Sequence, residues 1–273
     1  MEHLADTRQR AHSRRGWEEL LGRVGLVAKG VSYGLVGVLA AGVAAGVGGQ
    51  ATSRQGALHD LAGTGFGTFV IILLIIGFVA YAAWRVIQAV TVRESDEKKA
   101  WGKRIAYLAR AAVYGSLAYS AGRIVAGSGG GQSQNQKAHK TTAVVLSWPG
   151  GTWLVGIAGA VLIGVGLWNL YRGLSRKFED KWRGGMSSSA RKWGGRAGIV
   201  GHVARFVVFA LIGAFAIKAA SDYNPKDAVG LDGALQKLAH QSYGSYLLGL
   251  TAAGLIAYAI YCFFDARYRD LTQ

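Results

Sequence analysis

Three basic side chains recur at one place in a repeated pattern, each inside an apolar stretch of the chain. Each base follows an arginine by six residues, and the three bases are Lys29, Arg110 and His202. Four residues beyond each base stands an aromatic ring, in the order Tyr33, Tyr114 and Phe206. Like charges held together in a low-dielectric region repel, so an anion is needed to stabilise them. The pattern therefore indicates a pocket for an anionic ligand or a lipid headgroup.

A carboxylate on the last apolar stretch offers a counter-charge to these bases. Asp265 aligns with Gln88 and Arg172 between the repeated units, and Arg85, Asn169 and Arg205 lie at a similar depth. We predict a polar pocket facing the cytoplasm and formed by Lys29, Arg110, His202 and Asp265. The alternative is that each long side chain extends separately to the membrane surface, which requires no ligand. The sequence leaves both interpretations open.

Patterns typical of enzymes and metal sites are not found. The histidines do not align between repeats, because His59 is matched by Gln236 and His240 by Gly63. The chain has no HExxH motif, no paired Cys/His spacing, no nucleotide-binding loop and no G-x-S-x-G motif. Its one cysteine, Cys262, lies in an apolar stretch where packing explains it. We predict no catalytic residue, no metal and no cofactor, and therefore that the protein is not an enzyme.

Six apolar stretches must position the polar side chains. They lie near residues 24–46, 67–90, 105–126, 152–173, 197–219 and 244–265. Each covers roughly 20 residues, enough to cross a hydrocarbon core of about 30 Å. Charged residues make up 17% of the chain, against about 25% in soluble proteins. The sequence predicts an all-α membrane protein with six transmembrane helices.

The basic residues lie mostly in alternate segments between these stretches. Segments 1–23, 91–104, 172–196 and 267–273 hold 20 Lys and Arg, whereas 47–66, 127–150 and 221–243 hold five. Because cytoplasmic loops carry the excess of Lys and Arg, we predict that the first set and both termini are cytoplasmic. The net charge of +16 then reports topology, and no basic face that would bind nucleic acid stands out.

The apolar stretches come from internal repeats. Residues 56–84 match 233–261 at 11 of 29 positions without a gap, including G-A-L-x-x-L-A and A-Y-A. We divide the chain into a basic segment 1–22 and hairpin repeats 23–91, 104–174 and 196–267. Two helices in every unit give all three the same orientation, which predicts parallel repeats in a pseudo-threefold arrangement. We expect short interfacial helices at 56–63 and 232–240, and a flexible loop over 127–140.

The triplicated basic and aromatic pattern, the G-A-L-x-x-L-A loop and the G-x-x-A-Y return helix resemble a bacterial family catalogued as domain of unknown function 1206. The resemblance extends from Arg23 to Arg267, and it implies three hairpins and a location in the bacterial cytoplasmic membrane. It brings no activity and no catalytic residues. The middle copy lacks G-A-L-x-x-L-A, so the resemblance leaves open whether an equivalent outer loop exists there.

Two classes of function fit these observations. Abundant small residues at helix-packing spacing favour a structural or accessory membrane subunit. Bases at membrane depth favour a transporter, a channel or a protein that binds a small molecule or a lipid in a central polar pocket. The expected partners are the lipid bilayer, an anionic lipid and other membrane proteins, with no nucleic acid.

Overall fold

The computed structural model describes residues 2–46, 65–92, 94, 96–127, 134–183 and 185–270. These residues form α-helices joined by short links, without a strand among them. The helices are α1 (Glu2–Ala44), α3 (Gly65–Thr91), α4 (Glu97–Val125), α5 (Gln134–Leu146), α6 (Gly151–Leu174), α7 (Ser188–Ser221), α8 (Leu231–Ala239) and α9 (Gly244–Tyr268), with 3-10 turns η1 (Glu179–Lys181) and η2 (Pro225–Asp227). The prediction of an all-α protein is confirmed for the described residues.

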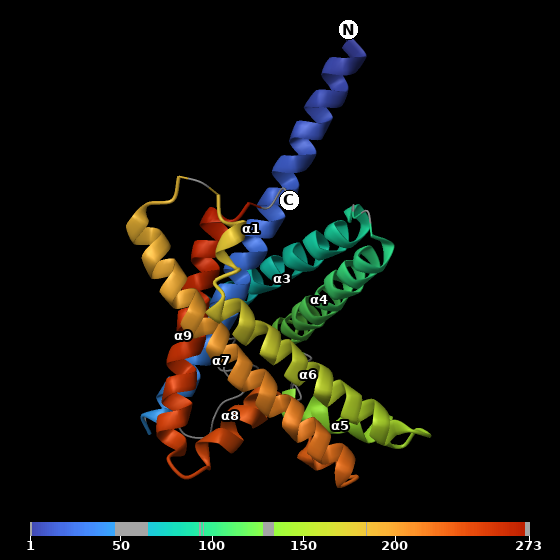
Figure 1. Cartoon of the computed structure of the whole chain (residues 1–273), viewed down its shortest axis with the longest axis vertical. Helices are drawn as coiled ribbons and strands as arrows, with labels where there is room; N and C mark the ends of the chain where they lie inside the picture. The colour runs from blue at the N-terminus through green and yellow to red at the C-terminus, as the bar shows by residue number, and fades with distance from the viewer. Residues whose placement is uncertain are drawn as a thin grey trace.

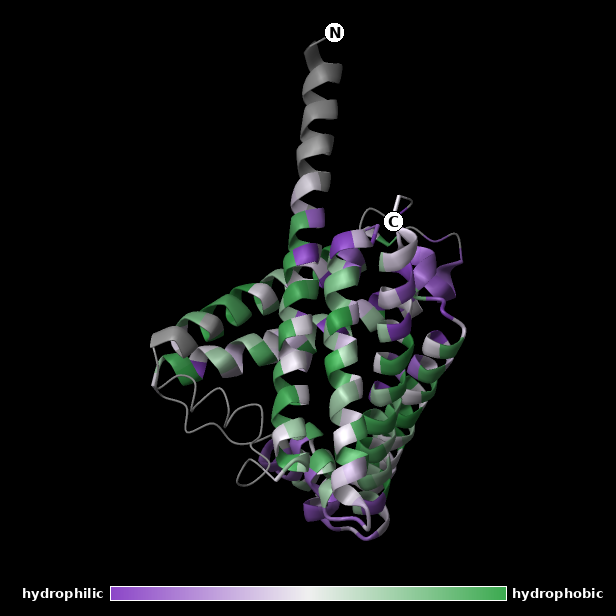
Figure 2. Ribbon diagram, turned by 90° about the vertical axis from the view of Figure 1, so that its left-hand side faces the viewer, coloured by the Kyte–Doolittle hydropathy of each residue, from purple (hydrophilic) through white to green (hydrophobic). Residues whose placement is uncertain are grey.

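Five helices of the described part are long and apolar enough to cross a membrane. They are Glu19–Ala44, Ile71–Thr91, Gly151–Leu174, Ser188–Ser221 and Gly244–Tyr268. The predicted span 105–126 lies in α4 except for its last residue, and α4 is not among the five. Figure 2 shows hydrophobic residues along the middle of the main bundle and hydrophilic residues gathered at its two ends.

Two short helices precede the return helices of the second and third repeats. The expected helix at 232–240 is present as α8, whereas 56–63 lies outside the described residues. The expectation of a flexible loop over 127–140 is wrong for 134–140, because α5 begins at Gln134. Gly151 and Gly244 begin the following helices, and a Cβ there would lie 1.9 and 2.1 Å from the carbonyl oxygens of Val145 and Ala239. The same tight turn therefore joins both pairs of helices.

The long helices pack in a chain of neighbours. α4 packs on α3, α3 on α1, α1 on α9, α9 on α7, and α7 on α6. α4 and α6, the helices at the two ends of this packing series, make no extensive contact in the described part of the molecule. In Figures 1 and 2 the α3–α4 pair extends away from the rest of the bundle. The bundle is therefore open between α4 and α6.

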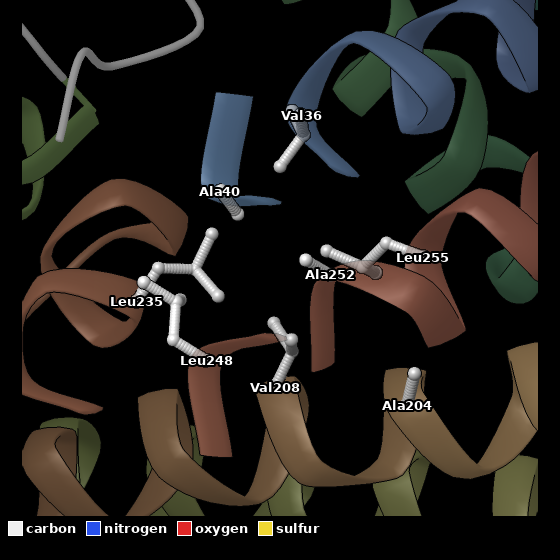
Figure 3. Close-up of a cluster of buried hydrophobic side chains, with 8 residues drawn as sticks. All are labelled: Val36, Ala40, Ala204, Val208, Leu235, Leu248, Ala252 and Leu255. Carbon is white, nitrogen blue, oxygen red and sulfur yellow. The ribbon is translucent and has the colours of Figure 1, made fainter. Parts of the chain in front are cut away.

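The largest apolar cluster joins four helices at the closed side of the bundle. Figure 3 shows Leu235 of α8 pointing toward residues of α1, α7 and α9. The buried members are Val36, Ala40, Ala204, Val208, Leu235, Leu248, Ala252 and Leu255. The short helix α8 thereby covers the end of the interface between α1, α7 and α9.

Candidate site at the opening between two helices

Close glycine contacts hold the two helices of the first and third hairpins together. A Cβ at Gly77 would lie 2.2 Å from the Cβ of Ala28, and one at Gly254 would lie 2.4 Å from the Cβ of Ala204. Real Cβ atoms essentially never approach so closely. Only glycine therefore permits these two helix crossings.

A second pair of glycines makes equivalent contacts in the same two hairpins. A Cβ at Gly25 would lie 2.5 Å from the Cβ of Tyr81, and one at Gly201 would lie 2.7 Å from the Cβ of Tyr258. The sequences agree with this geometry, because G-L-V-A-K at 25–29 corresponds to G-H-V-A-R at 201–205. Lys29 and Arg205 thus occupy the same place in the two hairpins.

The middle hairpin lacks these glycines. Val161 stands where the other hairpins have Gly77 and Gly254, and A-Y-L-A-R at 106–110 replaces the G-x-V-A motif. A valine cannot enter a crossing that leaves no room for a Cβ. This substitution explains why α4 and α6 do not pack.

Exposure along α6 follows from the open crossing. Trp84 and Tyr261 are equivalent in the first and third hairpins, and each is 2% exposed. Their counterpart Trp168 on α6 is 56% exposed, and Val161 is 59% exposed. The middle hairpin therefore presents to its surroundings an apolar surface that the other two hairpins bury.

Arginines from three helices flank this opening near the end of α6. Arg85 of α3 is buried and donates to the Tyr81 hydroxyl at 2.5 Å and to Gln88 Oε1 at 2.6 Å. Its guanidinium lies 5.5 Å from the centroid of the Tyr107 ring, and that of the exposed Arg110 lies 5.9 Å from the same ring. Arg110 also interacts electrostatically with Arg85 and with Arg172 of α6. The three arginines therefore form one cationic cluster.

Two further cations lie deeper, around Tyr258. The Lys29 ammonium is 5.1 Å from the centroid of the Tyr258 ring. Arg205 donates to the Tyr258 hydroxyl at 2.6 Å, and its guanidinium lies 4.6 Å from that ring. Tyr33 contacts the other edge, with ring centroids 4.8 Å apart. Aromatic faces and a hydroxyl, rather than carboxylates, surround these cations.

No ion pair within the described part of the chain joins Lys29, Arg85, Arg110, Arg172 or Arg205 to a carboxylate. The Nε atoms of Arg85 and Arg205 are buried and have no hydrogen-bond partner. Buried charges in proteins are normally paired. The described part of the chain thus holds five cations without a paired carboxylate, of which Arg85 is buried, three are partly buried and Arg110 is exposed.

Asp265 pairs with residues outside this group of cations. Its carboxylate pairs with Arg269 at 3.1 Å and accepts a hydrogen bond from Trp182 Nε1 at 3.2 Å. Burial lowers the pKa of Arg269, but the neighbouring Asp265 carboxylate raises it, and the net result is a pKa above the usual value. Trp182 and Arg269 also form a β-bridge, which fastens the link between α6 and α7 to the end of α9. Asp265 therefore fixes the link between α6 and α7 to the C-terminal end of α9.

Lys181, in the η1 turn, adds a titratable cation beside the cluster. The residue is exposed as a whole, but its ammonium is partly desolvated. This desolvation and the neighbouring Arg269, Arg172 and Arg85 lower the pKa of Lys181 to about 8, against the opposing effect of Asp265. Desolvation and Arg269 are the larger causes of this shift, and Arg172 and Arg85 contribute to it.

Comparison with known proteins agrees with the repeat structure. The model of a family described as Domain of Unknown Function (DUF1206) matches three times, at residues 24–92, 105–176 and 200–269. The chain belongs to this family. It is also similar to the Bacillus subtilis (strain 168) protein named "Uncharacterized protein YxxB", with 34% identity over 262 residues that cover 94% of this chain and 93% of the relative. No solved structure matches the chain.

The family copies correct the alignment of the basic residues. The sixth residue of each copy is Lys29, Arg110 and Arg205. His202 was aligned with Lys29 by counting from Arg196, which is out of register by three residues. His202 is buried, stacks on the Phe178 ring with centroids 5.1 Å apart, and contacts the Gly198 carbonyl oxygen through Nδ1 at 2.7 Å. Its environment is that of a packed core side chain.

Of the four predicted pocket residues, the structure places Lys29 and His202 on the same ring, that of Tyr258, whose centroid is 5.4 Å from that of His202. Arg110 lies instead at the opening, and Asp265 pairs with Arg269. The residues that sequence reasoning left outside the pocket are Arg85, Arg172 and Arg205. Alignment of G-L-V-A-K with G-H-V-A-R would have included Arg205.

Proposed function

We propose that the chain crosses the membrane six times, with α4 as the sixth span. Arg104, Arg110 and Arg123 lower the hydropathy of α4, yet this helix corresponds to α1 and α7 in the repeated family copies. The excess of Lys and Arg in alternate links supports placing the N-terminal segment and the links near Lys98 and Arg183 in the cytoplasm of a bacterial cell. Cysteine labelling in intact cells tests this topology, and labelling at position 98 without permeabilisation would contradict it.

We infer a pseudo-threefold arrangement of the hairpins from equivalent contacts between successive units. A Cβ at Gly37 of α1 would lie 3.0 Å from the Ala252 carbonyl oxygen of α9. In the corresponding place, a Cβ at Gly213 of α7 would lie 2.6 Å from the Gly159 carbonyl oxygen of α6. The third corresponding position is Ala118 of α4, which is buried against α3. Three related interfaces support one axis, and the opening between α4 and α6 interrupts the ring.

We propose that the protein binds an anionic ligand at the cytoplasmic half of the bundle. The observation that carries this proposal is the group of five cations without a paired carboxylate. Their mutual repulsion in a low-dielectric region is relieved when an anion binds, and arginine suits phosphate because it donates two parallel hydrogen bonds. The proposal includes no catalytic step.

This binding function is favoured over the structural or accessory role that the sequence suggested. The evidence for an accessory role was the abundance of small residues. In the structure, Gly37, Gly77, Gly159, Gly213 and Gly254 are occupied in contacts within the chain. These five glycines therefore explain how the helices cross closely, whereas a Cβ at Gly42, Gly115 or Gly164 would have no heavy atom within 4 Å.

The test uses protein extracted into a phosphorus-free neutral detergent. We expect phosphorus to co-purify with the wild type, and inorganic phosphate to raise its thermal stability more than chloride does. The double variant Arg110→Gln, Arg172→Gln should lose about tenfold or more of this binding, since hydrogen bonds to charged groups contribute about 1.5–3 kcal/mol each. Arg196→Gln is the matched control, because Arg196 is also exposed and lies 5.5 Å from an aromatic ring, that of Trp193. Equal binding by all three proteins would refute the proposal.

A further inference from the structure

We propose that the ligand is an anionic phospholipid, held in the opening between α4 and α6 with its phosphate on Arg85, Arg110 and Arg172. This inference rests on the proposed function, and it adds the class of ligand and the route of entry. An acyl chain would lie along Val161, Val165 and Trp168 of α6.

The apolar surface of the opening favours a lipid over a small anion. Val161, Val165 and Trp168 are 59, 39 and 56% exposed, whereas the equivalent residues of the other two hairpins are buried. An inorganic anion at the arginines would leave this surface uncovered. An acyl chain would cover it as lipid tails cover apolar surface elsewhere in a bilayer, so the apolar surface accommodates the tail and the arginines supply the preference for an anionic headgroup.

The spacing along α6 matches one leaflet of a bilayer. Arg172 and Val161 are eleven positions apart, which is about 16 Å at the helical rise of 1.5 Å per residue. Half of a hydrocarbon core of about 30 Å is about 15 Å. A lipid whose phosphate contacts Arg172 therefore has acyl chains long enough to reach the open crossing at Val161.

The charges select an anionic headgroup in the cytoplasmic leaflet. Arg85 and Arg110 share the Tyr107 ring, and Arg172 interacts electrostatically with Arg110. In the proposed topology this cluster lies on the cytoplasmic side, where α3 and α6 end and α4 begins. A zwitterionic lipid brings a cation toward three arginines, whereas a phosphatidylglycerol headgroup does not.

The experiment measures lipids bound to the full chain by native mass spectrometry after incubation with mixed micelles of phosphatidylglycerol and phosphatidylcholine. We expect preferential binding of phosphatidylglycerol. Val161→Trp should fill the opening and reduce that binding about tenfold, while leaving the thermal stabilisation by inorganic phosphate unchanged. Ile157→Trp is the matched control, because Ile157 is 57% exposed and its equivalents Leu73 and Leu250 are exposed as well. It should bind phosphatidylglycerol as the wild type does.

The outcomes separate this inference from the proposed function. Phosphatidylglycerol binding that is equal in Val161→Trp and Ile157→Trp would overturn the lipid site. So would stabilisation by inorganic phosphate without phosphatidylglycerol binding, but the anion-binding function would then stand. If the wild-type protein is detected at twice the mass of one chain and Val161→Trp is not, a second copy of the chain occupies the opening, which would also overturn the inference. Binding of neither probe would refute both proposals.

Discussion

Replacing Gly254 by valine should open the third hairpin as Val161 opens the second. A Cβ at Gly254 would lie 2.4 Å from the Ala204 Cβ, about 1 Å closer than the 3.4 Å at which ordinary van der Waals contact begins. The clash is with a helix-bound methyl group that has no rotamer to change, so α7 and α9 must separate. Overpacking of this kind costs about 1–3 kcal/mol. We expect Gly254→Val to cost about 2 kcal/mol, in the middle of this range.

The matched control is Gly164→Val on α6, where a Cβ has no heavy atom within 4 Å. Both substitutions replace glycine by valine inside a helix and so change the helix propensity alike. Equilibrium unfolding by sodium dodecyl sulfate in mixed micelles compares their free energies of unfolding. Gly254→Val should be less stable by about 2 kcal/mol, a change of about thirtyfold in the ratio of folded to unfolded protein.

A compensating pair makes the reasoning sharper. Gly254→Ala alone should destabilise the protein, and adding Ala204→Gly should restore most of the loss, because the two Cβ atoms no longer meet. If Gly254→Val is as stable as Gly164→Val, or if Ala204→Gly rescues nothing, the close crossing is not what holds the hairpin together. The explanation of the opening by Val161 would then be wrong as well.

Three further predictions concern the opening and the link between α6 and α7. Val161→Gly should let α4 approach α6, which spin labels on the two helices would report as a shorter distance; an unchanged distance would contradict the role of Val161. Asp265→Asn should cost about 3–5 kcal/mol in the same unfolding assay, because it leaves Arg269, whose side chain is 11% exposed, without its carboxylate; stability equal to the wild type would contradict this. Binding of phosphatidylglycerol should weaken as pH rises above 8, because burial and nearby arginines lower the pKa of Lys181 to about 8 and the ammonium loses its charge there. A bound phosphate raises that pKa, so the midpoint should lie above 8, and Lys181→Arg should abolish the dependence.

Much of the fold could be predicted because lipid imposes a simple rule. Apolar stretches of spanning length must be helical, since backbone groups in a bilayer need internal hydrogen bonds. The helix α8 was foreseen from Leu235 and Leu238, which recur at helical spacing and are both buried. The helix α5 was missed because its beginning, Q-N-Q-K, is polar and follows a Gly-rich segment. Polar residues form helices readily when tertiary contacts support them. Here the Asn135 side chain supplies such a contact by accepting a hydrogen bond from the Gly230 backbone amide.

The candidate site was predicted less well. Its residues depend on the exact alignment of the three repeats and on the absence of packing between α4 and α6. Counting from Arg196 placed His202 in the site, whereas the glycine contacts place Arg205 there. The partner of Asp265 could not be foreseen either. Arg269 lies one helical turn after Asp265, beyond the end of the predicted apolar stretch. The opening itself comes from Val161 and Ala106, which stand where the other hairpins have glycines in close contact.

A crystal structure of the protein grown in a lipid phase containing phosphatidylglycerol would test anion binding most directly. The proposed site predicts phosphate density within hydrogen-bond distance of the Arg110 and Arg172 guanidinium groups, with an acyl chain beside Val161. Arginines that point separately to the membrane surface, with α4 packed against α6 and no phosphate between them, would contradict it.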